Sequence, residues 1–552
     1  MPRLILLLLT AALGGSSVAC ADPCHVIAAH QPDEAEKAYL AADYAQAADL
    51  YRKALADKPN DPALIAGLAR TLERQQKSEE AVKVVSDALA AHPVPALLVT
   101  EAEAEYYDGR PWDAERTALA AQKDNLCNPR LHLLLASIAD ITSNFATGYK
   151  QLQFAHQLDP HDPEIRGLWI DTLPQAERIA ELEKYLDEPV GLDADEVTRM
   201  RQSLEDMKKQ AKEPVKACRL VSNTQQTQMY FSLLTVDYTR ASTFGLHVKL
   251  NKHNANLEID TGSSGLLVSR SIAARAGIKP FSEVDVNGIG DKKSSTGYRG
   301  YADTIHIGDL EFHDCSVTVV DNDRLDDVDG LIGMDVFSDF LVTLDYPKRK
   351  LHLDPLPKRP DEAADAAPSL STSSDPASNT APKAGDETGK QSAAGKPAAG
   401  QIPRGLHDQY VPPELKDYSA VYRMDHDLML PVALNESKLK LFILDTGSWA
   451  TNISPEAARE VTKVRSNEFA NVRGINGQVE KVYEADQVIF SFAHVSQKIL
   501  HVPSFDTTSV SKSVGLKISG FLGARTLRLT TIHIDYRDGL VKFDYDPKRL
   551  PG

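Results

Sequence analysis

The chain contains the tripeptide Asp-Thr-Gly twice, and the two copies have matching surroundings. An apolar segment precedes each copy, a serine follows it, and an apolar-apolar-Gly turn ends 73 or 78 residues after the aspartate. Matched flanks of this kind indicate an internal duplication, so two related domains are predicted in the C-terminal half. The residues concerned are Asp260, Thr261, Gly262, Ser263 and Gly333 in the first copy, and Asp445, Thr446, Gly447, Ser448 and Gly523 in the second.

This duplicated pattern resembles the aspartic proteases, whose retropepsin-like lobes each supply one Asp-Thr-Gly loop. The resemblance covers residues 228–356 and 415–548, about half of the chain. It implies that Asp260 and Asp445 form a catalytic dyad that activates one water molecule for peptide hydrolysis. Two carboxyls in contact cannot both ionise, so they share a proton and supply both an acid and a base. Such a site needs no cofactor and no metal ion.

The resemblance also assigns supporting roles to the residues around the two aspartates. The threonines are expected to hydrogen-bond across the lobe interface, and the serines to bond the outer carboxylate oxygens. The loop glycines permit a tight turn, and the downstream glycines lie beneath the loops, where a side chain would collide. The supporting residues are Thr261, Gly262, Ser263 and Gly333 in one lobe, and Thr446, Gly447, Ser448 and Gly523 in the other.

A hairpin that covers the substrate is expected between each catalytic loop and its glycine turn. Glycine-rich segments with the right position are 286–301 in the first lobe and 472–478 in the second. Their candidate substrate-covering residues are Gly290, Tyr298, Tyr301 and Gly474.

The two loops are not equivalent, because Trp449 stands where the first copy has Ser264. An indole beside the aspartate either shapes a pocket or obstructs the cleft. The leading hypothesis is therefore an aspartic endopeptidase. The alternative is a non-catalytic scaffold of the cell envelope that binds peptides or proteins with degenerate protease-like lobes.

Residues 30–215 are predicted to form helical repeats, because similar residues recur with a period of 34. Small residues where helices touch, and a proline after the second helix, resemble the tetratricopeptide repeat. Such repeats stack into a curved array with a concave surface. That surface either binds substrate or a partner protein, or the array only stabilises the fold. The matching positions are Ala47 and Ala81, Tyr51 and Val85, Ala54 and Ala88, and Pro59 and Pro93.

The predicted fold is therefore multidomain, with an N-terminal all-α tetratricopeptide-like solenoid followed by two all-β retropepsin-like acid-protease lobes. The lobes are expected to pair within the chain, with pairing between chains as the alternative. A linker poor in large apolar residues separates them and is predicted to be disordered. The predicted boundaries are a signal peptide at 1–21, repeats at 30–215, the first lobe at 218–357, the linker at 358–410 and the second lobe at 411–552.

The N-terminal segment has the pattern of an export signal, with Arg3, an apolar stretch and a small-residue exit. Cleavage after Ala21 predicts a periplasmic or secreted protein, and the alternative is a lipoprotein anchored through Cys20. An exported chain permits disulfides. Pairing within domains predicts Cys24 with Cys127 and Cys218 with Cys315, with free buried thiols as the alternative.

Charge and motif spacing exclude several other functions. The formal net charge of −17 argues against nucleic acid and anionic membrane surfaces as partners. The acidic run 321–329 lacks the ligand spacing of a calcium-binding loop, and the histidines lack zinc-ligand spacing. After signal removal no transmembrane segment is expected.

Overall fold

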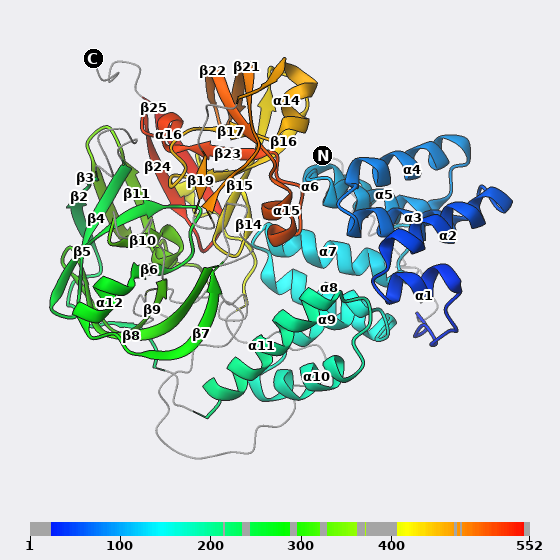
Figure 1. Cartoon of the computed structure of the whole chain (residues 1–552), viewed down its shortest axis with the longest axis horizontal. Coiled ribbons are helices and arrows are strands. Elements are labelled where there is room, and N and C mark those ends of the chain that lie inside the picture. The colour runs from blue at the N-terminus through cyan, green and yellow to red at the C-terminus, as the bar shows by residue number, and fades with distance from the viewer. Residues whose placement is uncertain are drawn as a thin grey trace, which may run out of the picture.

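The structure of the chain is a computed structural model. It describes residues 24–212, 216–234, 243–286, 295–320, 328–360, 370, 406–467, 472–474 and 477–545. A helical array forms one side of the molecule, and two β-rich lobes form the rest, with the second lobe between the array and the first lobe (Figure 1). The predicted fold class, helical repeats followed by two β lobes, is confirmed. The predicted signal peptide lies outside the described residues.

The array consists of antiparallel helix pairs that follow one another along the chain. Several helices begin at a proline, which suits the first helical position because its missing N–H would have no partner there. An Asp or Asn side chain precedes many of them and accepts first-turn N–H groups, as Asp61 does before α3. The helices are α1 (Glu34–Leu40), α2 (Tyr44–Asp57), α3 (Pro62–Arg74), α4 (Ser78–Ala91), α5 (Pro95–Tyr107), α6 (Pro111–Ala121), α7 (Pro129–Ile141), α8 (Phe145–Leu158), α9 (Pro163–Asp171), α10 (Gln175–Asp187) and α11 (Ala194–Gln210).

The 34-residue period of the sequence corresponds to equivalent positions in α2 and α4. Ala47 and Ala81 are both fully buried, as are Ala69 on α3 and Ala104 on α5. Small side chains at these positions let neighbouring helices approach closely. This explains why alanine recurs there within the chain.

Ion pairs join charged side chains of α3, α5, α7 and α9. Glu103 of α5, only 2% exposed, accepts bonds from Arg70 Nε at 3.2 Å and Arg130 Nε at 2.7 Å. Arg130 Nη1 also contacts Glu164 Oε2 at 2.7 Å. These charged groups are therefore partnered within the array.

The end of the array folds back to its beginning. The N–H of Gly191, between α10 and α11, donates to the carbonyl of Leu40 at 2.8 Å. Arg74 of α3 also contacts Glu196 of α11, with Nη2 to Oε1 at 2.8 Å. The first and last repeats are therefore tied together.

The first lobe is a nine-stranded sheet in the order β1-β9-β6-β10-β5-β4-β8-β7, with β3 paired to β4. A short helix, α12 (Arg270–Ala276), packs against it, and the 3-10 helix η1 (Met334–Phe337) follows β10. The strands are β1 (Arg219–Leu220), β3 (Ser232–Leu234), β4 (Thr243–Leu250), β5 (His253–Asp260), β6 (Leu266–Ser269), β7 (Pro280–Val286), β8 (Ser295–Ile307), β9 (Leu310–Val320) and β10 (Gly330–Gly333).

The second lobe repeats this plan with an eight-stranded sheet in the order β14-β15-β16-β23-β17-β22-β21-β18. A small separate hairpin, β19 with β20, accompanies it. The strands are β14 (Tyr422–Met424), β15 (Asp427–Leu434), β16 (Leu439–Asp445), β17 (Asn452–Ile453), β18 (Val464–Ser466), β19 (Arg473–Gly474), β20 (Gly477–Gln478), β21 (Val482–Phe492), β22 (Val495–Phe505) and β23 (Gly520–Gly523). Its helices are η3 (Pro413–Leu415), α14 (Pro455–Val461), α15 (Thr508–Val514) and α16 (Ala524–Leu527).

A six-stranded sheet joins the two lobes. Its order is β13-β25-β24-β11-β12-β2, and the lobes meet where β11 pairs with β24, from Leu341 opposite Asp535 to Asp345 opposite Thr531. The hairpin β11–β12 of the first lobe and the hairpin β24–β25 of the second thus form one continuous sheet. The strands are β2 (Thr227–Tyr230), β11 (Phe340–Asp345), β12 (Lys350–Pro355), β13 (Ser419–Ala420), β24 (Thr530–Asp535) and β25 (Leu540–Tyr545).

The described ends of the predicted linker are held at one point of the second lobe. Arg359 Nη2 contacts Asp538 Oδ1 at 2.5 Å, and the N–H of Tyr410 donates to the same oxygen at 2.8 Å. Asp408 also bonds Thr147 of α8. Residues 361–369 and 371–405 lie outside the described part of the chain.

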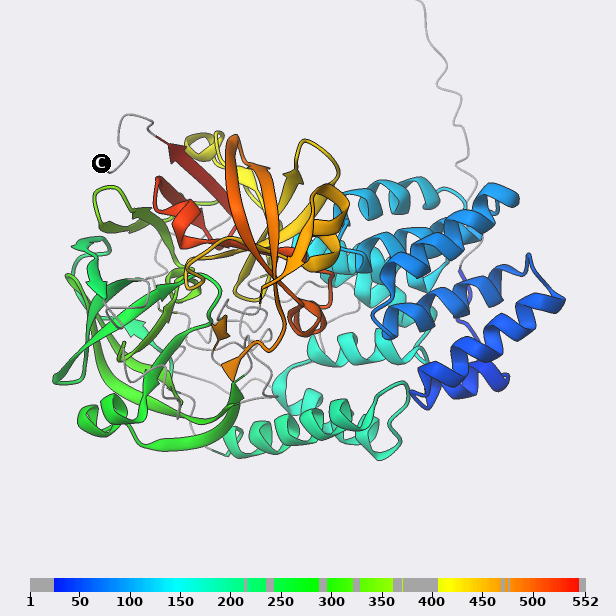
Figure 2. The same ribbon diagram turned by 45° about the horizontal axis from the view of Figure 1, so that its top comes forward.

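The helical array and the second lobe share one apolar core. Helices α5, α6 and α7 contribute Val99, Ala118 and Ile138, among others, and the lobe contributes residues such as Leu441 and Phe521. The array is therefore packed on the lobe through buried apolar side chains, and the two parts lie side by side in both views (Figures 1 and 2).

Lys517 reinforces this junction. Its Nζ contacts Glu79 Oε1 of α4 at 2.9 Å, Asp108 Oδ1 at 3.4 Å and Glu456 Oε1 of α14 at 3.0 Å. Its backbone N–H donates to the carbonyl of Tyr107 at 3.1 Å. Because the side chain is only 19% exposed, solvent screens these contacts weakly.

Two disulfides fix the ends of the domains, Cys24–Cys127 and Cys218–Cys315, which is the pairing expected from the sequence. The first ties the described N-terminus to the segment before α7, and the second holds the entry strand of the first lobe against β9. Within the described residues, no helix has the length and apolar character needed to cross a membrane.

Replacing Lys517 with Met should weaken the junction, because Glu79 and Glu456 would then face each other without the cation between them, while Asp108 would keep Arg110 as its cationic partner. Hydrogen bonds to charged groups contribute about 1.5–3 kcal/mol, and a loss of that order in the free energy of unfolding is expected by urea titration. Lys512→Met, at an exposed position of neighbouring α15, is the matched control. Equal stability of the two variants would contradict this role.

Candidate active site

Each Asp-Thr-Gly loop leaves the end of a buried strand, beside the glycine turn of the same lobe. In the first lobe β5 runs parallel to β10, with Asp260 opposite Gly333. In the second, β16 runs parallel to β23, with Asp445 opposite Gly523. The duplicated sequence spacing therefore corresponds to the same strand pairing in both lobes.

The two turn glycines are required by close approach of the backbone. A Cβ on Gly333 would lie 2.2 Å from the carbonyl oxygen of Ser263, and one on Gly523 would lie 2.4 Å from the carbonyl carbon of Ala450. Neither distance is tolerable for a side chain, so these positions accept only glycine while the loops keep this conformation.

Reciprocal hydrogen bonds join the two loops across the lobe interface. The N–H of Thr261 donates to Oγ1 of Thr446, and the N–H of Thr446 donates to Oγ1 of Thr261, both at 3.0 Å. Each hydroxyl then donates to a carbonyl of the other lobe, Thr261 to Leu444 at 2.7 Å and Thr446 to Ile259 at 3.0 Å. Both threonines are buried, so these bonds fix the relative position of the loops.

This arrangement brings the two aspartates together. A Cβ on Gly447 would lie 2.3 Å from Cγ of Asp260, and a Cβ on Gly262 would lie 2.9 Å from Cγ of Asp445. Each carboxyl therefore packs on the loop glycine of the opposite lobe. Backbone N–H groups hold the carboxyls in place, from Gly262 to Asp260 Oδ1 at 3.0 Å and from Ser448 to Asp445 Oδ1 at 2.9 Å.

The environment favours one proton on the pair. Burial raises the pKa of Asp445 well above its usual value, and the charge of Asp260 and a hydrogen bond between the carboxyls raise it further. The N–H of Ser448 acts in the opposite direction. Asp445 is 7% exposed, whereas Asp260 is only partly buried. A carboxylic acid beside a carboxylate can donate a proton while its neighbour accepts one.

The loops differ in what supports them from beneath. In the first lobe, Asp335 accepts the N–H of Gly265 at 2.9 Å and the hydroxyl of Ser264 at 3.2 Å. In the second lobe Arg525 takes the place of Asp335, and its backbone N–H donates to the carbonyl of Trp449 at 2.9 Å. Asp335 was not among the residues predicted from the sequence. An aspartate stands two residues after the glycine turn in the first copy only, so the duplicated pattern gave no signal for it.

Trp449 borders the second loop and is 37% exposed. The guanidinium of Arg528 lies over its ring, 5.4 Å from the centroid. A cation over an aromatic face is attracted by the ring electrons, so the indole has a fixed support on one side.

The resemblance implied that the serines after the two loops bond the carboxylates through their hydroxyls. Among the described residues, neither serine hydroxyl makes this bond. Ser448 reaches Asp445 with its N–H, and its hydroxyl donates to the carbonyl of Ala450 at 3.1 Å. Ser263 donates its N–H to the carbonyl of Asp260 at 3.3 Å. In both loops a backbone amide bonds the carboxylate, that of Gly262 in the first loop and that of Ser448 in the second.

The segments predicted to cover the substrate are hairpins in both lobes. In the first, β7 pairs with β8, and the candidate Gly290 lies outside the described residues. Tyr301 stacks on Phe281 of β7 at 4.5 Å, and Arg270 of α12 lies over the ring of Tyr298, so the two tyrosines are held by different elements. In the second, Gly474 of β19 pairs with Gly477 of β20.

A histidine that carries no motif also lies near the site. His426, in the turn between β14 and β15, contacts Asp427, with Nε2 to Oδ1 at 3.6 Å. Burial lowers its pKa, but the charges of Asp427, Asp335, Asp425 and Asp260 outweigh burial and raise it. The sequence offered no signal for it, because its proximity arises only when the second lobe's hairpin meets the first lobe.

Comparison with known families agrees with this geometry. Residues 246–336 match the aspartyl protease family, and residues 38–98 match the tetratricopeptide repeat. The chain thus contains an aspartyl protease-type domain and tetratricopeptide repeats. Comparison with curated proteins finds no significant match.

Among solved structures, a crystal structure of a thermophilic tetratricopeptide-repeat protein from Thermus thermophilus is similar, at 22% sequence identity and a TM-score of 0.25. The match covers 30% of this chain and 92% of that one.

Replacing Thr446 with Val should destabilise the loop pair, since the N–H of Thr261 and the carbonyl of Ile259 would both lose their partner. An unsatisfied buried group costs about 1–3 kcal/mol, and a loss of that order is expected in urea unfolding, together with lower activity in any assay of the site. Thr446→Ser keeps the hydroxyl and is the control. The interface account fails if Val and Ser behave alike.

Proposed function

We propose that the protein is an aspartic endopeptidase whose single active site is formed by Asp260 and Asp445 within one chain. The observation that carries this proposal is the contact of each carboxyl with the loop glycine of the other lobe, at the centre of reciprocal threonine hydrogen bonds. The match of residues 246–336 to the aspartyl protease family supports the same conclusion.

The chemistry follows from the shared proton. The ionised carboxylate accepts a proton from a water molecule as that water attacks the peptide carbonyl carbon. The protonated carboxyl donates its proton to the carbonyl oxygen, which gives a tetrahedral diol. Collapse of the diol breaks the C–N bond as a proton passes to the leaving amine. The acid and base roles of Asp260 and Asp445 exchange during this cycle, because the pair titrates as a unit.

The rest of the chain fits an exported enzyme that acts on peptides or proteins. Two disulfides suit an oxidising compartment, so we propose a periplasmic or secreted location. We also propose that the helical repeats bind substrate or a partner protein, as the presence of tetratricopeptide repeats supports.

Asp260→Asn and Asp445→Asn should each abolish peptide cleavage and its inhibition by pepstatin, while the fold is retained. A drop of at least about 10³-fold in kcat/KM is expected, because either substitution removes the shared proton. Asp303→Asn, at a side chain 80% exposed on β8, is the control. A single variant that keeps its activity would refute a shared dyad, and peptide binding without turnover by the unaltered chain would favour the scaffold alternative.

Cleavage should also be lost as the pH rises through the raised pKa of Asp445, because both carboxyls are then ionised and no acid remains.

The raised pKa of Asp445 also affects folding. The folded-state pKa exceeds the unfolded value of about 3.9, so the proton stabilises the fold at low pH, and this contribution disappears as pH rises through the folded pKa. Activity and urea stability measured from acid to neutral pH test both points, with Asp445→Asn as reference. An activity that rises steadily to alkaline pH would contradict a shared proton.

A further inference from the structure

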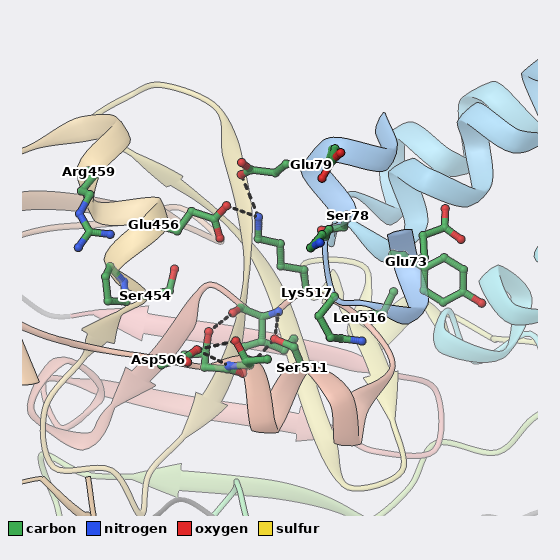
Figure 3. A pocket seen from close by; sticks show the side chains of 18 of the residues that line it. Glu73, Ser78, Glu79, Ser454, Glu456, Arg459, Asp506, Ser511, Leu516 and Lys517 are labelled. Carbon is green, nitrogen blue, oxygen red and sulfur yellow. Dashed lines mark hydrogen bonds and ion pairs between the residues drawn. The ribbon is translucent and has the colours of Figure 1, made fainter. Parts of the chain in front are cut away.

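A cavity of about 620 Å³ lies between the helical array and the second lobe, apart from the aspartate pair (Figure 3). One wall comes from α3, α4 and the end of α5, and the other from the beginnings of α14 and α15, from β21 and from residues 515–518. Its volume is within the range of about 300–1,000 Å³ of sites that enclose ligands.

Most acids that line the cavity are already occupied. Glu79 and Glu456 flank Lys517, at 2.9 and 3.0 Å from its Nζ (Figure 3). These two carboxyls also hydrogen-bond each other; burial and this contact raise the pKa of Glu456. Glu80 contacts Arg52 outside the cavity at 2.8 Å. Asp506, on the second-lobe side of the cavity, accepts the N–H of Thr508 at 2.8 Å at the start of α15.

Three cations on the cavity wall have no carboxylate partner among the described residues: Lys77 before α4, Arg459 of α14 and Lys481 before β21. Arg459 lies over the ring of Tyr483, 5.6 Å from the centroid, which holds the guanidinium beside the cavity. The lining also carries five acids, so these three cations, and not the overall charge of the cavity, are what it offers to an anionic ligand.

A buried acid on the array side also has a free polar atom. Glu73 of α3 is 8% exposed, and its Oε1 has no hydrogen-bond partner among the described residues. Burial and the charge of Glu103 raise its pKa well above the usual value, despite the nearby Arg70. An uncharged carboxyl can donate a hydrogen bond to a carbonyl or carboxylate oxygen, and an unpartnered buried polar group is costly unless a ligand or water satisfies it.

We propose that this cavity is a binding site for an acidic peptide segment of a substrate or partner protein, separate from the catalytic cleft. Carboxylates of the segment pair with Arg459 and Lys481 of the second lobe and with Lys77 of the array, and Glu73 donates to the segment from the array side. The site goes beyond the proposed catalytic function and does not depend on it, because every group that it uses lies outside the aspartate loops. Charge complementarity of this kind selects partners and speeds their association.

Binding of a fluorescein-labelled peptide of about six Asp and Glu residues to the full-length chain carrying Asp260→Asn would test this site by fluorescence anisotropy. The same peptide with Asn and Gln is the neutral probe. We expect the acidic peptide to bind at least about tenfold more tightly, and the difference to shrink as salt screens the charges.

The double variant Arg459→Gln/Lys481→Gln should weaken binding of the acidic peptide by about tenfold or more. Lys512→Gln/Arg465→Gln removes the same charges from the second lobe at residues outside the cavity lining and should leave binding unchanged. Glu73→Gln, which keeps a donor, should bind more tightly than Glu73→Ala. Equal binding of the two peptides, or equal loss in the two double variants, would overturn the proposal. Catalysis is not measured, so these outcomes are independent of the endopeptidase assignment.

Discussion

The hydrogen bonds exchanged by Thr261 and Thr446 set the geometry on which the site depends. They are buried, they are made twice, and each hydroxyl also bonds a strand carbonyl of the other lobe. With the loops fixed in this way, each carboxyl packs on the loop glycine of the opposite lobe, and the two carboxyls meet. The shared proton is a consequence of this proximity and of burial, which together disfavour a second negative charge.

The helical array is part of the same framework and not a separate module on a tether. Its core continues into the second lobe through α5, α6 and α7. Within the array, Arg70 and Arg130 both pair with the buried Glu103. The partner that we propose for the repeats would therefore meet a surface shaped by both parts of the chain, and the cavity beside Lys517 is one such place.

Much of this organisation could be predicted from the sequence, for identifiable reasons. The paired Asp-Thr-Gly loops and their glycine turns have strict steric requirements, so Gly333 and Gly523 signal their roles directly. The 34-residue period is visible because Ala47 and Ala81 occupy equivalent buried positions. Contacts between distant segments leave no pattern in the sequence. Local spacing does not predict the pairing of β11 with β24, the position of His426 near the aspartate pair, or the junction at Lys517.

The lobes are related by duplication, but their catalytic loops have diverged. An interface between identical copies must present the same groups on both sides. Here Ser264 and Asp335 on one side correspond to Trp449 and Arg525 on the other. The polypeptide substrate that we propose would therefore meet unlike chemistry in its two halves, and so its N-to-C direction can be distinguished. Two identical walls related by a twofold axis could not do this.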